Sequence, residues 1–168
     1  EGVNVSALTN LKTLDVQKCK LLSLDVTKNL ALTSLICNNN SLTSLDVSNN
    51  TSLVKFYCND NKLPKINVVA NTALQEFDIS NNLLSALNIR NNTALTYLNV
   101  SNNAAISMVD VQYNTVLERL CCNGIAIGEL NIVNNTALKK LECHTNKNLT
   151  IVTCGKAFAN ATNRFIGS

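Results

Sequence analysis

The chain has 168 residues, enough for one domain with a substantial core. Apolar residues make up 46% of it but aromatic residues only 4%, with no Trp, which suggests a core of many small aliphatic layers. The net charge of +3 comes without a run of Lys or Arg, so a nucleic-acid-binding protein is not expected. No apolar run approaches the ~20 residues of a transmembrane helix, so no membrane span is expected either.

The sequence repeats itself along almost its whole length. Residues 32–50 read LTSLICNNNSLTSLDVSNN, in which LTSLICNNN is followed by the closely similar LTSLDVSNN. The pattern L-x-x-L-x-V/I/C-x-x-N recurs at steps of ten and eleven residues, so two half-repeats make a repeat of 21 residues, with one extra residue near Ala104–Ala105. The half-repeats begin at Leu11, Leu21, Leu32, Leu42, Leu53, Leu63, Leu74, Leu84, Leu95, Ile106, Leu117, Ile127, Leu138 and Leu149.

The two half-repeats differ in kind. Type A includes LTSLICNNN at Leu32 and LVKFYCNDN at Leu53, and type B includes LTSLDVSNN at Leu42 and LSALNIRNN at Leu84. Both alternate with a period of two, so each contains a short strand with alternate side chains inward. Like strands return every 21 residues and should stack about 4.8 Å apart. We therefore predict a mainly β, parallel solenoid of about eight coils over residues 1–156, with little or no helix, and a C-terminal cap or extension over residues 157–168.

Asn closes most half-repeats, and we interpret it as structural. A turn inside a solenoid leaves backbone groups unpaired, and a stacked Asn amide can donate to them and accept from them. Cys19 and Ile125 take its place in two turns, which are expected to be locally altered. The Asn residues are Asn40, Asn50, Asn61, Asn71, Asn82, Asn92, Asn103, Asn114, Asn135 and Asn146.

The combined pattern L-x-x-L-x-C-x-x-N-x-L-x-x-L-D-V-x-x-N resembles the leucine-rich repeat family, specifically its 21-residue nested bacterial class, called IRREKO. LICNNNSLTSLDVSNNTSL and FYCNDNKL carry the resemblance, which spans about residues 3–155, and SLDVSNNTSL is most similar to secreted or surface proteins of the Bacteroidetes. The chain departs from the pattern at Ile79 and Val100, in the usual Cys slot, and near Ala104. The resemblance implies a right-handed curved solenoid that binds partners through a concave sheet of type A strands, without catalysis.

Seven cysteines raise the question of disulfides or a metal site. Five of them occupy inward slots, where buried free thiols are expected, although a bond between Cys37 and Cys58 on adjacent coils stays open. The chain has no C-x-x-C and a single His, so no metal site is expected. Cys121 points outward by alternation and is expected to be the most accessible thiol. The inward cysteines are Cys37, Cys58, Cys122, Cys143 and Cys154.

The sequence carries no catalytic or cofactor motif. G-x-S-x-G, a P-loop and paired acids are all absent. The lone His144 falls on the outward face of a type A strand, and a Cys–His pair with Cys121 would need the thiol within hydrogen-bond reach. The prediction is a protein that is not an enzyme and needs no cofactor.

The outward side chains of the type A strands vary more than a fold requires. Position five of type B is Asn, Asp or Thr in every coil, so its side chains are expected to bond to neighbouring backbone. The middle type A strands instead gather charges and aromatic rings, and Tyr and Arg are favoured at interface hot spots. An ordinary solvated sheet face would also tolerate such residues. The candidate partner-binding residues are Lys55, Tyr57, Glu76, Asp78, Tyr97, Asn99 and Arg119.

Two functions fit these observations. The first is a non-catalytic protein–protein interaction or adhesion module of a bacterium, secreted or at the cell surface, with a protein ligand such as a host or matrix protein. The alternative is a surface glycan-binding module. A glycan site needs exposed aromatic rings for stacking, and only Tyr57 and Tyr97 offer them on this face.

Overall fold

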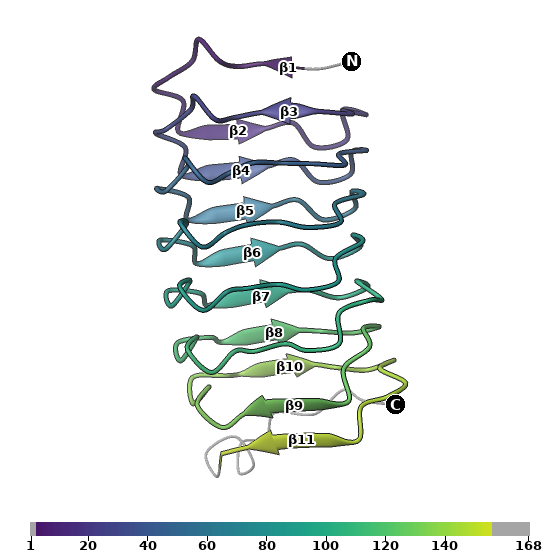
Figure 1. Ribbon diagram of the computed structural model, residues 1–168. Helices are drawn as coiled ribbons and strands as arrows, with labels where there is room; N and C mark the ends of the chain where they lie inside the picture. The colour runs from purple at the N-terminus through teal and green to yellow at the C-terminus, as the bar shows by residue number, and fades with distance from the viewer. Residues whose placement is uncertain (1–2, 156–168) are drawn as a thin grey trace.

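The computed structural model describes residues 3–155, which form one continuous stack of short coils (Figure 1). The type A half-repeats supply a parallel seven-stranded sheet that runs the length of the stack, in the order β10-β8-β7-β6-β5-β4-β2. No helix occurs in the described residues. The strands of this sheet are β2 (Thr13–Asp15), β4 (Ser34–Ile36), β5 (Lys55–Tyr57), β6 (Glu76–Asp78), β7 (Tyr97–Asn99), β8 (Arg119–Cys121) and β10 (Lys140–Glu142).

The repeat length sets the register of this sheet. Ser34 lies opposite Lys55, one 21-residue repeat later. Tyr97 lies opposite Arg119, 22 residues later, which confirms the extra residue near Ala104–Ala105. The seven type A strands correspond to about seven coils, one fewer than the eight or so predicted from the repeat.

The type B half-repeats form strands only at the two ends of the described stack. β1 (Val3–Asn4) pairs with β3 (Leu24–Asp25), and β9 (Glu129–Ile132) pairs with β11 (Ile151–Cys154). Glu129 lies opposite Ile151, 22 residues later, so this coil holds a second extra residue that the sequence reading missed.

In the middle coils, the type B segments 42–48, 63–69, 84–90 and 106–111 are not strands. A groove of about 420 Å³ lies between residues 43–46 and 65–67, and one of about 460 Å³ lies between residues 107–112 and 128–131. The middle coils therefore lack strand pairing on the type B side. Parallel pairing was expected on both sides, and in the middle coils it holds on the type A side alone.

The core follows from the period-two alternation. The middle residue of every type A strand is buried, and in β5 and β6 this residue is Phe. The Phe56 and Phe77 rings stack with centroids 5.2 Å apart and planes 9° from parallel. A fully buried side chain of this size stabilises the fold by about 1.5–3 kcal/mol. The other buried middle residues are Leu14, Leu35, Leu98, Leu120 and Leu141.

The Asn residues that close the type A half-repeats tie adjacent coils together. Asn61 donates from Nδ2 to the carbonyls of Cys37 (3.1 Å) and Cys58 (3.0 Å), and its Oδ1 accepts from the Leu42 N–H (3.0 Å). Each amide therefore bonds in both directions, as predicted. The same role falls to Asn40, Asn82, Asn103 and Asn146.

The type B Asn residues donate but do not accept. Asn71 donates from Nδ2 to the carbonyls of Val47 (2.9 Å) and Asn50 (2.8 Å) in the preceding coil. Its Oδ1 is buried without a hydrogen-bond partner, and so are those of its counterparts. The prediction that these Asn side chains donate hydrogen bonds to the backbone is confirmed. The prediction that they also accept hydrogen bonds is wrong for the type B residues. The counterparts are Asn29, Asn50, Asn92, Asn114 and Asn135.

The two turns without a ladder Asn are altered, as predicted. Cys19 is exposed and precedes Lys20, whose φ of +56° is a second positive φ in this turn besides the one at Lys18 that every coil has. In the second turn the Ile125 N–H donates to Asn146 Oδ1 at 2.8 Å, whereas the ladder Asn of a regular coil, such as Asn61, accepts from a residue 19 positions earlier. A Cβ on Gly124 would lie 2.6 Å from Asn102 Oδ1, so a larger residue there would require the Asn102 side chain to move.

Position five of type B serves the coil itself, as predicted. Asp25 Oδ1 accepts the backbone N–H of Thr27 at 2.9 Å, and Asp46 Oδ1 accepts that of Ser48 at 2.9 Å. Asx turns of this kind fix the chain direction where a strand ends. The same bond is made by Asn4, Asn67, Asn88, Asp110 and Asn131.

All seven cysteines are free, but the predicted order of their accessibility is wrong. Cys121 is only 2% exposed, because its thiol lies against the side chains of Arg119 and Glu142. Burial raises the pKa of the Cys121 thiol, and it raises that of Cys37 to about 12. Cys19 is the exposed thiol.

We therefore expect iodoacetamide at pH 8 to alkylate Cys19 of the native protein well before Cys121, because Cys19 is exposed to the reagent, whereas burial shields the Cys121 thiol and raises its pKa. Peptide mass spectrometry at successive times gives the order. Cys19→Ser should remove the fast phase and Cys121→Ser should leave it intact. Equal rates at the two cysteines would mean that Arg119 and Glu142 do not cover the Cys121 thiol.

Candidate functional site

All seven candidate residues lie on one face of the sheet, on four adjacent strands. The middle residues of β5, β6, β7 and β8 point into the core, so the first and third residues of each strand point away from it. Lys55 and Tyr57 are the outward residues of β5, and Glu76 and Asp78 those of β6. Tyr97 and Asn99 follow on β7 and Arg119 on β8. We call these seven residues the sheet-face patch.

One half of the sheet-face patch centres on Glu76. The Tyr57 hydroxyl donates to Glu76 Oε2, and Lys55 Nζ lies 3.2 Å from the same oxygen. Lys55 Nζ also lies 4.4 Å from the centroid of the Tyr57 ring. The hydrogen bond from Tyr57, with help from Lys55, lowers the pKa of Glu76. This half is therefore a charged pair that holds an aromatic ring in place.

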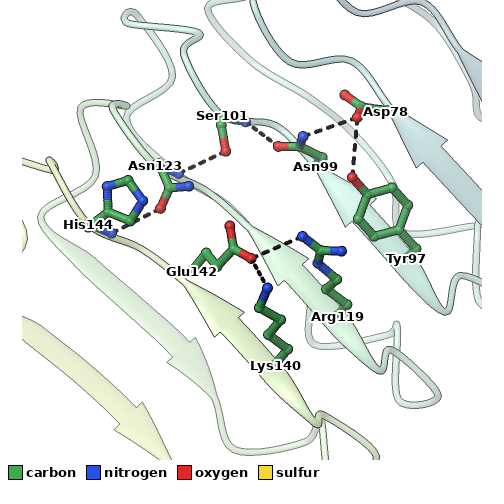
Figure 2. A network of polar contacts seen from close by, with 9 residues as sticks. All are labelled: Asp78, Tyr97, Asn99, Ser101, Arg119, Asn123, Lys140, Glu142 and His144. Carbon is green, nitrogen blue, oxygen red and sulfur yellow. Dashed lines mark hydrogen bonds and ion pairs between the residues drawn. The ribbon is translucent and has the colours of Figure 1, made fainter. Parts of the chain in front are cut away.

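The other half centres on Asp78 (Figure 2). Asp78 Oδ2 accepts from the Tyr97 hydroxyl at 3.2 Å and from Asn99 Nδ2 at 3.1 Å. Its Oδ1 accepts from the backbone N–H (3.0 Å) and the hydroxyl (2.6 Å) of Ser80. Asn99 Oδ1 accepts the N–H of Ser101 at 3.1 Å. Asp78 and Asn99 thus make the Asx-turn bond that sequence reading assigned to type B alone.

Arg119 links the patch to β10. Its guanidinium lies 5.3 Å from the Tyr97 ring centroid, and its Nη2 lies 3.0 Å from Glu142 Oε1. Lys140 Nζ lies 2.6 Å from the same oxygen (Figure 2). Sequence reasoning left out Lys140 and Glu142, although the repeat places them one coil beyond Arg119 and the register shows it.

A shallow hollow of about 420 Å³ opens over the starts of the strands. It is lined by Tyr57, Glu76, Thr96, Tyr97, Glu118 and Arg119. Thr96 and Glu118 were not candidates, because they precede the strands and alternation gives them no outward assignment. Glu118 is paired with Lys139 at 2.7 Å. The hollow therefore presents two aromatic rings beside charges of both signs.

Both tyrosines of the patch stay protonated well above neutral pH. Burial is the main cause that raises the pKa of Tyr57, followed by its hydrogen bond to Glu76. Burial also raises the pKa of Tyr97, followed by the charge of Asp78. Each hydroxyl therefore donates to a carboxylate, and neither is set up as a base.

The Cys–His pair does not form. The Cys121 thiol lies against Arg119 and Glu142, and His144 follows the end of β10. The His144 backbone N–H donates to Asn123 Oδ1 at 3.0 Å, which places it at the edge of the network in Figure 2. Over residues 3–155 no group of three or more His, Cys, Asp or Glu side chains could hold a metal ion.

These features agree with those of known solved structures. The functional domain of InlJ from Listeria monocytogenes superposes with a TM-score of 0.83 and 27% identity, over 92% of this chain and 37% of that one. The chain folds as a leucine-rich-repeat solenoid. Internalin InlF of Listeria monocytogenes (TM-score 0.73, 24% identity, 98% of this chain, 56% of that one) shares the fold. So does the leucine-rich effector YopM of Yersinia pestis (0.70, 19%, 87% and 44%).

The solenoid spans only 37% to 56% of the length of these three structures. No family model and no curated protein matches the sequence. The InlJ domain is described as including a cysteine ladder. In this chain Cys37 and Cys58 stack on adjacent coils, as do Cys122 and Cys143, with Ile79 and Val100 in the same slot between them. Within the described part of the chain, no helix is long and apolar enough to span a bilayer.

Proposed function

We propose that this solenoid is a non-catalytic protein-binding module whose partner docks on the sheet-face patch. The observation that carries the proposal is the arrangement of Tyr57, Tyr97 and Arg119, which stand together beside an open hollow. Tyr and Arg dominate interface hot spots, because they combine a large apolar surface with a polar end. The resemblance to leucine-rich repeats implies binding through the concave sheet of type A strands, which supports the same interpretation.

The cross-strand bonds of the patch favour binding. Immobilising a flexible side chain at an interface costs about 0.5–1.5 kcal/mol. Here Glu76 already holds Tyr57, Asp78 holds Tyr97, and Glu142 holds Arg119. A partner that meets these side chains in place therefore avoids most of that cost.

The type B side is a weaker candidate. Its position-five side chains are engaged in Asx turns, and apart from Lys65 the other side chains along the groove beside Leu45 and Ile66 are short or aliphatic. The groove beside Met108 is lined by small, aliphatic, amide and acidic residues. Neither groove contains an aromatic ring or an arginine.

The proteins of similar structure suggest where this chain acts and what kind of partner it binds. The internalins and YopM are bacterial, and the name of YopM calls it an effector. We infer for this chain a bacterial source, a place outside the cell or on its surface, and a host or matrix protein as partner. No cofactor enters this function.

The test screens the 168-residue protein for binding to immobilised host and matrix proteins. The affinity for the ligand found in this screen is then measured. Tyr97→Ala and Arg119→Ala should each weaken binding by about 1–3 kcal/mol, as hot-spot truncations do. The control is Met108→Ala, at a residue 72% exposed on the type B side, which should leave affinity unchanged. Loss of binding in Met108→Ala alone would place the interface on the opposite side.

A glycan ligand is the second candidate, and the observation in its favour is the hollow itself. Tyr57 and Tyr97 flank it, and Glu76, Glu118 and Arg119 supply acceptors and a donor of the kind that sugar hydroxyls need. A glycan array decides between the two. Saturable glycan binding that Tyr57→Ala abolishes, without a protein ligand, would replace the protein-binding proposal.

A further inference from the structure

We propose that Asp78 is a positioning residue of the binding face: it holds the Tyr97 ring, and through that ring Arg119, in the arrangement that a partner meets, and it makes no contact with the partner itself. This inference rests on the proposed function, and it separates Asp78 from the residues that would touch a ligand.

The hydrogen bonds of Asp78 leave it nothing to offer a partner. A carboxylate has about four acceptor sites. Asp78 Oδ1 receives the N–H and the hydroxyl of Ser80, and Oδ2 receives the Tyr97 hydroxyl and Asn99 Nδ2. All four sites are therefore occupied from within the chain. A partner donor could reach Asp78 only by displacing one of these bonds.

The Tyr97 ring is held at two places. Its hydroxyl donates to Asp78 on β6, and the Arg119 guanidinium from β8 lies 5.3 Å from its centroid. Arg119 is itself tethered to Glu142 on β10 at 3.0 Å. Asp78, Tyr97, Arg119 and Glu142 lie on four successive strands of the sheet, β6, β7, β8 and β10 (Figure 2). Removing the Asp78 carboxylate frees the Tyr97 hydroxyl, so the Tyr97 ring can move. Arg119 then no longer faces an aromatic ring that is held in place.

The chain contains an aspartate at the equivalent position of another coil that does not contact a tyrosine. Asp15 has the same position in β2, and its carboxylate accepts from the N–H (3.1 Å) and from Nε2 (3.1 Å) of Gln17. Both aspartates thus make the local turn bond, and only Asp78 also holds a tyrosine. Substituting both compares the positioning role with the turn role alone.

The experiment compares Asp78→Ser with Asp15→Ser. The Ser hydroxyl can still accept the N–H two residues on, but it is too short to reach Tyr97. Scalar couplings on tyrosine-labelled protein give the population of the native Tyr97 side-chain rotamer without any partner. We expect that population to fall in Asp78→Ser and to stay unchanged in Asp15→Ser. Tyr97→Phe removes the same bond without touching the turn, and it decides the matter if Asp78→Ser fails to fold.

The same variants are then measured against the ligand found for the wild type. Affinity scales with the fraction of molecules in the binding-competent arrangement, so Kd should rise by the factor by which the native rotamer population falls, roughly two- to tenfold. An unchanged rotamer population in Asp78→Ser would overturn the inference. So would a freed ring with unchanged affinity when Tyr97→Ala weakens binding. If Tyr97→Ala also leaves affinity unchanged, the proposed binding face is wrong. The rotamer population of Tyr97 then still shows whether Asp78 fixes the Tyr97 ring.

Discussion

Phe77→Ala is expected to lower the free energy of unfolding by about 3–5 kcal/mol, the usual cost of emptying a buried phenylalanine site. Phe77 is fully buried and stacks on Phe56 of the preceding coil, so both transfer and packing energy are lost. A coil of a solenoid contacts only its neighbours, so this cavity also weakens the coupling between the two halves of the stack. Urea unfolding followed by circular dichroism measures the loss.

Two controls sharpen this measurement. Tyr113→Ala removes an aromatic ring that is 44% exposed, and it should cost less than about 1 kcal/mol. The double variant Phe56→Ala/Phe77→Ala should lose less than the sum of the single variants, because the stacked pair contributes about 0.5–1.5 kcal/mol beyond burial. A cost at Phe77 no larger than at Tyr113 would contradict the inward assignment of the strand centres.

Stability is expected to fall steeply as pH rises from about 9 to about 12. Burial raises the pKa of Cys37 to about 12, and it also raises the pKa values of Cys58 and Cys122. In the unfolded chain these thiols ionise near pH 8.5, so their contribution is fully present below that pH and is lost above it. Each buried thiol lowers the free energy of unfolding by about 1.4 kcal/mol for every pH unit in this range. Urea unfolding between pH 7.5 and 11 measures the slope.

The chain supplies its own control for this effect. Ile79 and Val100 occupy the same inward slot as Cys37 and Cys58, so the slot accepts a β-branched residue. Replacing Cys37, Cys58 and Cys122 by Val should flatten the slope by about 4 kcal/mol per pH unit, three times the contribution of one thiol. The remaining decline above pH 10 belongs to Tyr57 and Tyr97, whose pKa values are also raised. An unchanged slope in the triple variant would show that the thiols ionise within the fold.

The repeat made most of the fold predictable. A 21-residue period fixes which residues are neighbours on adjacent coils, so Lys55, Glu76 and Tyr97 could be placed side by side from the sequence. Inward and outward faces followed from alternation. The loss of strand pairing in the middle type B segments did not follow, because the same sequence pattern does form paired strands at the two ends of the stack.

The contacts between side chains were less predictable than their positions. Alternation correctly put Cys121 on the outward face, but whether Arg119 and Glu142 cover it depends on their rotamers. The same holds for Asp78, whose fourfold bonding needs Tyr97 to lean across from the next strand. Position five of type A looked free of structural duty, since Ile36 and Cys121 occur there beside Asp15 and Asp78. Only the structure separates the members that hold a turn from those that do not.

Photo-crosslinking tests the central claim, that the partner docks on the sheet face, most directly. A photoreactive amino acid is placed at Thr96, beside the hollow, and in a second protein at Met108 on the type B side. Each is irradiated with the bound ligand. We expect a covalent adduct from position 96 and none from position 108. An adduct from position 108 with none from position 96 would contradict the account.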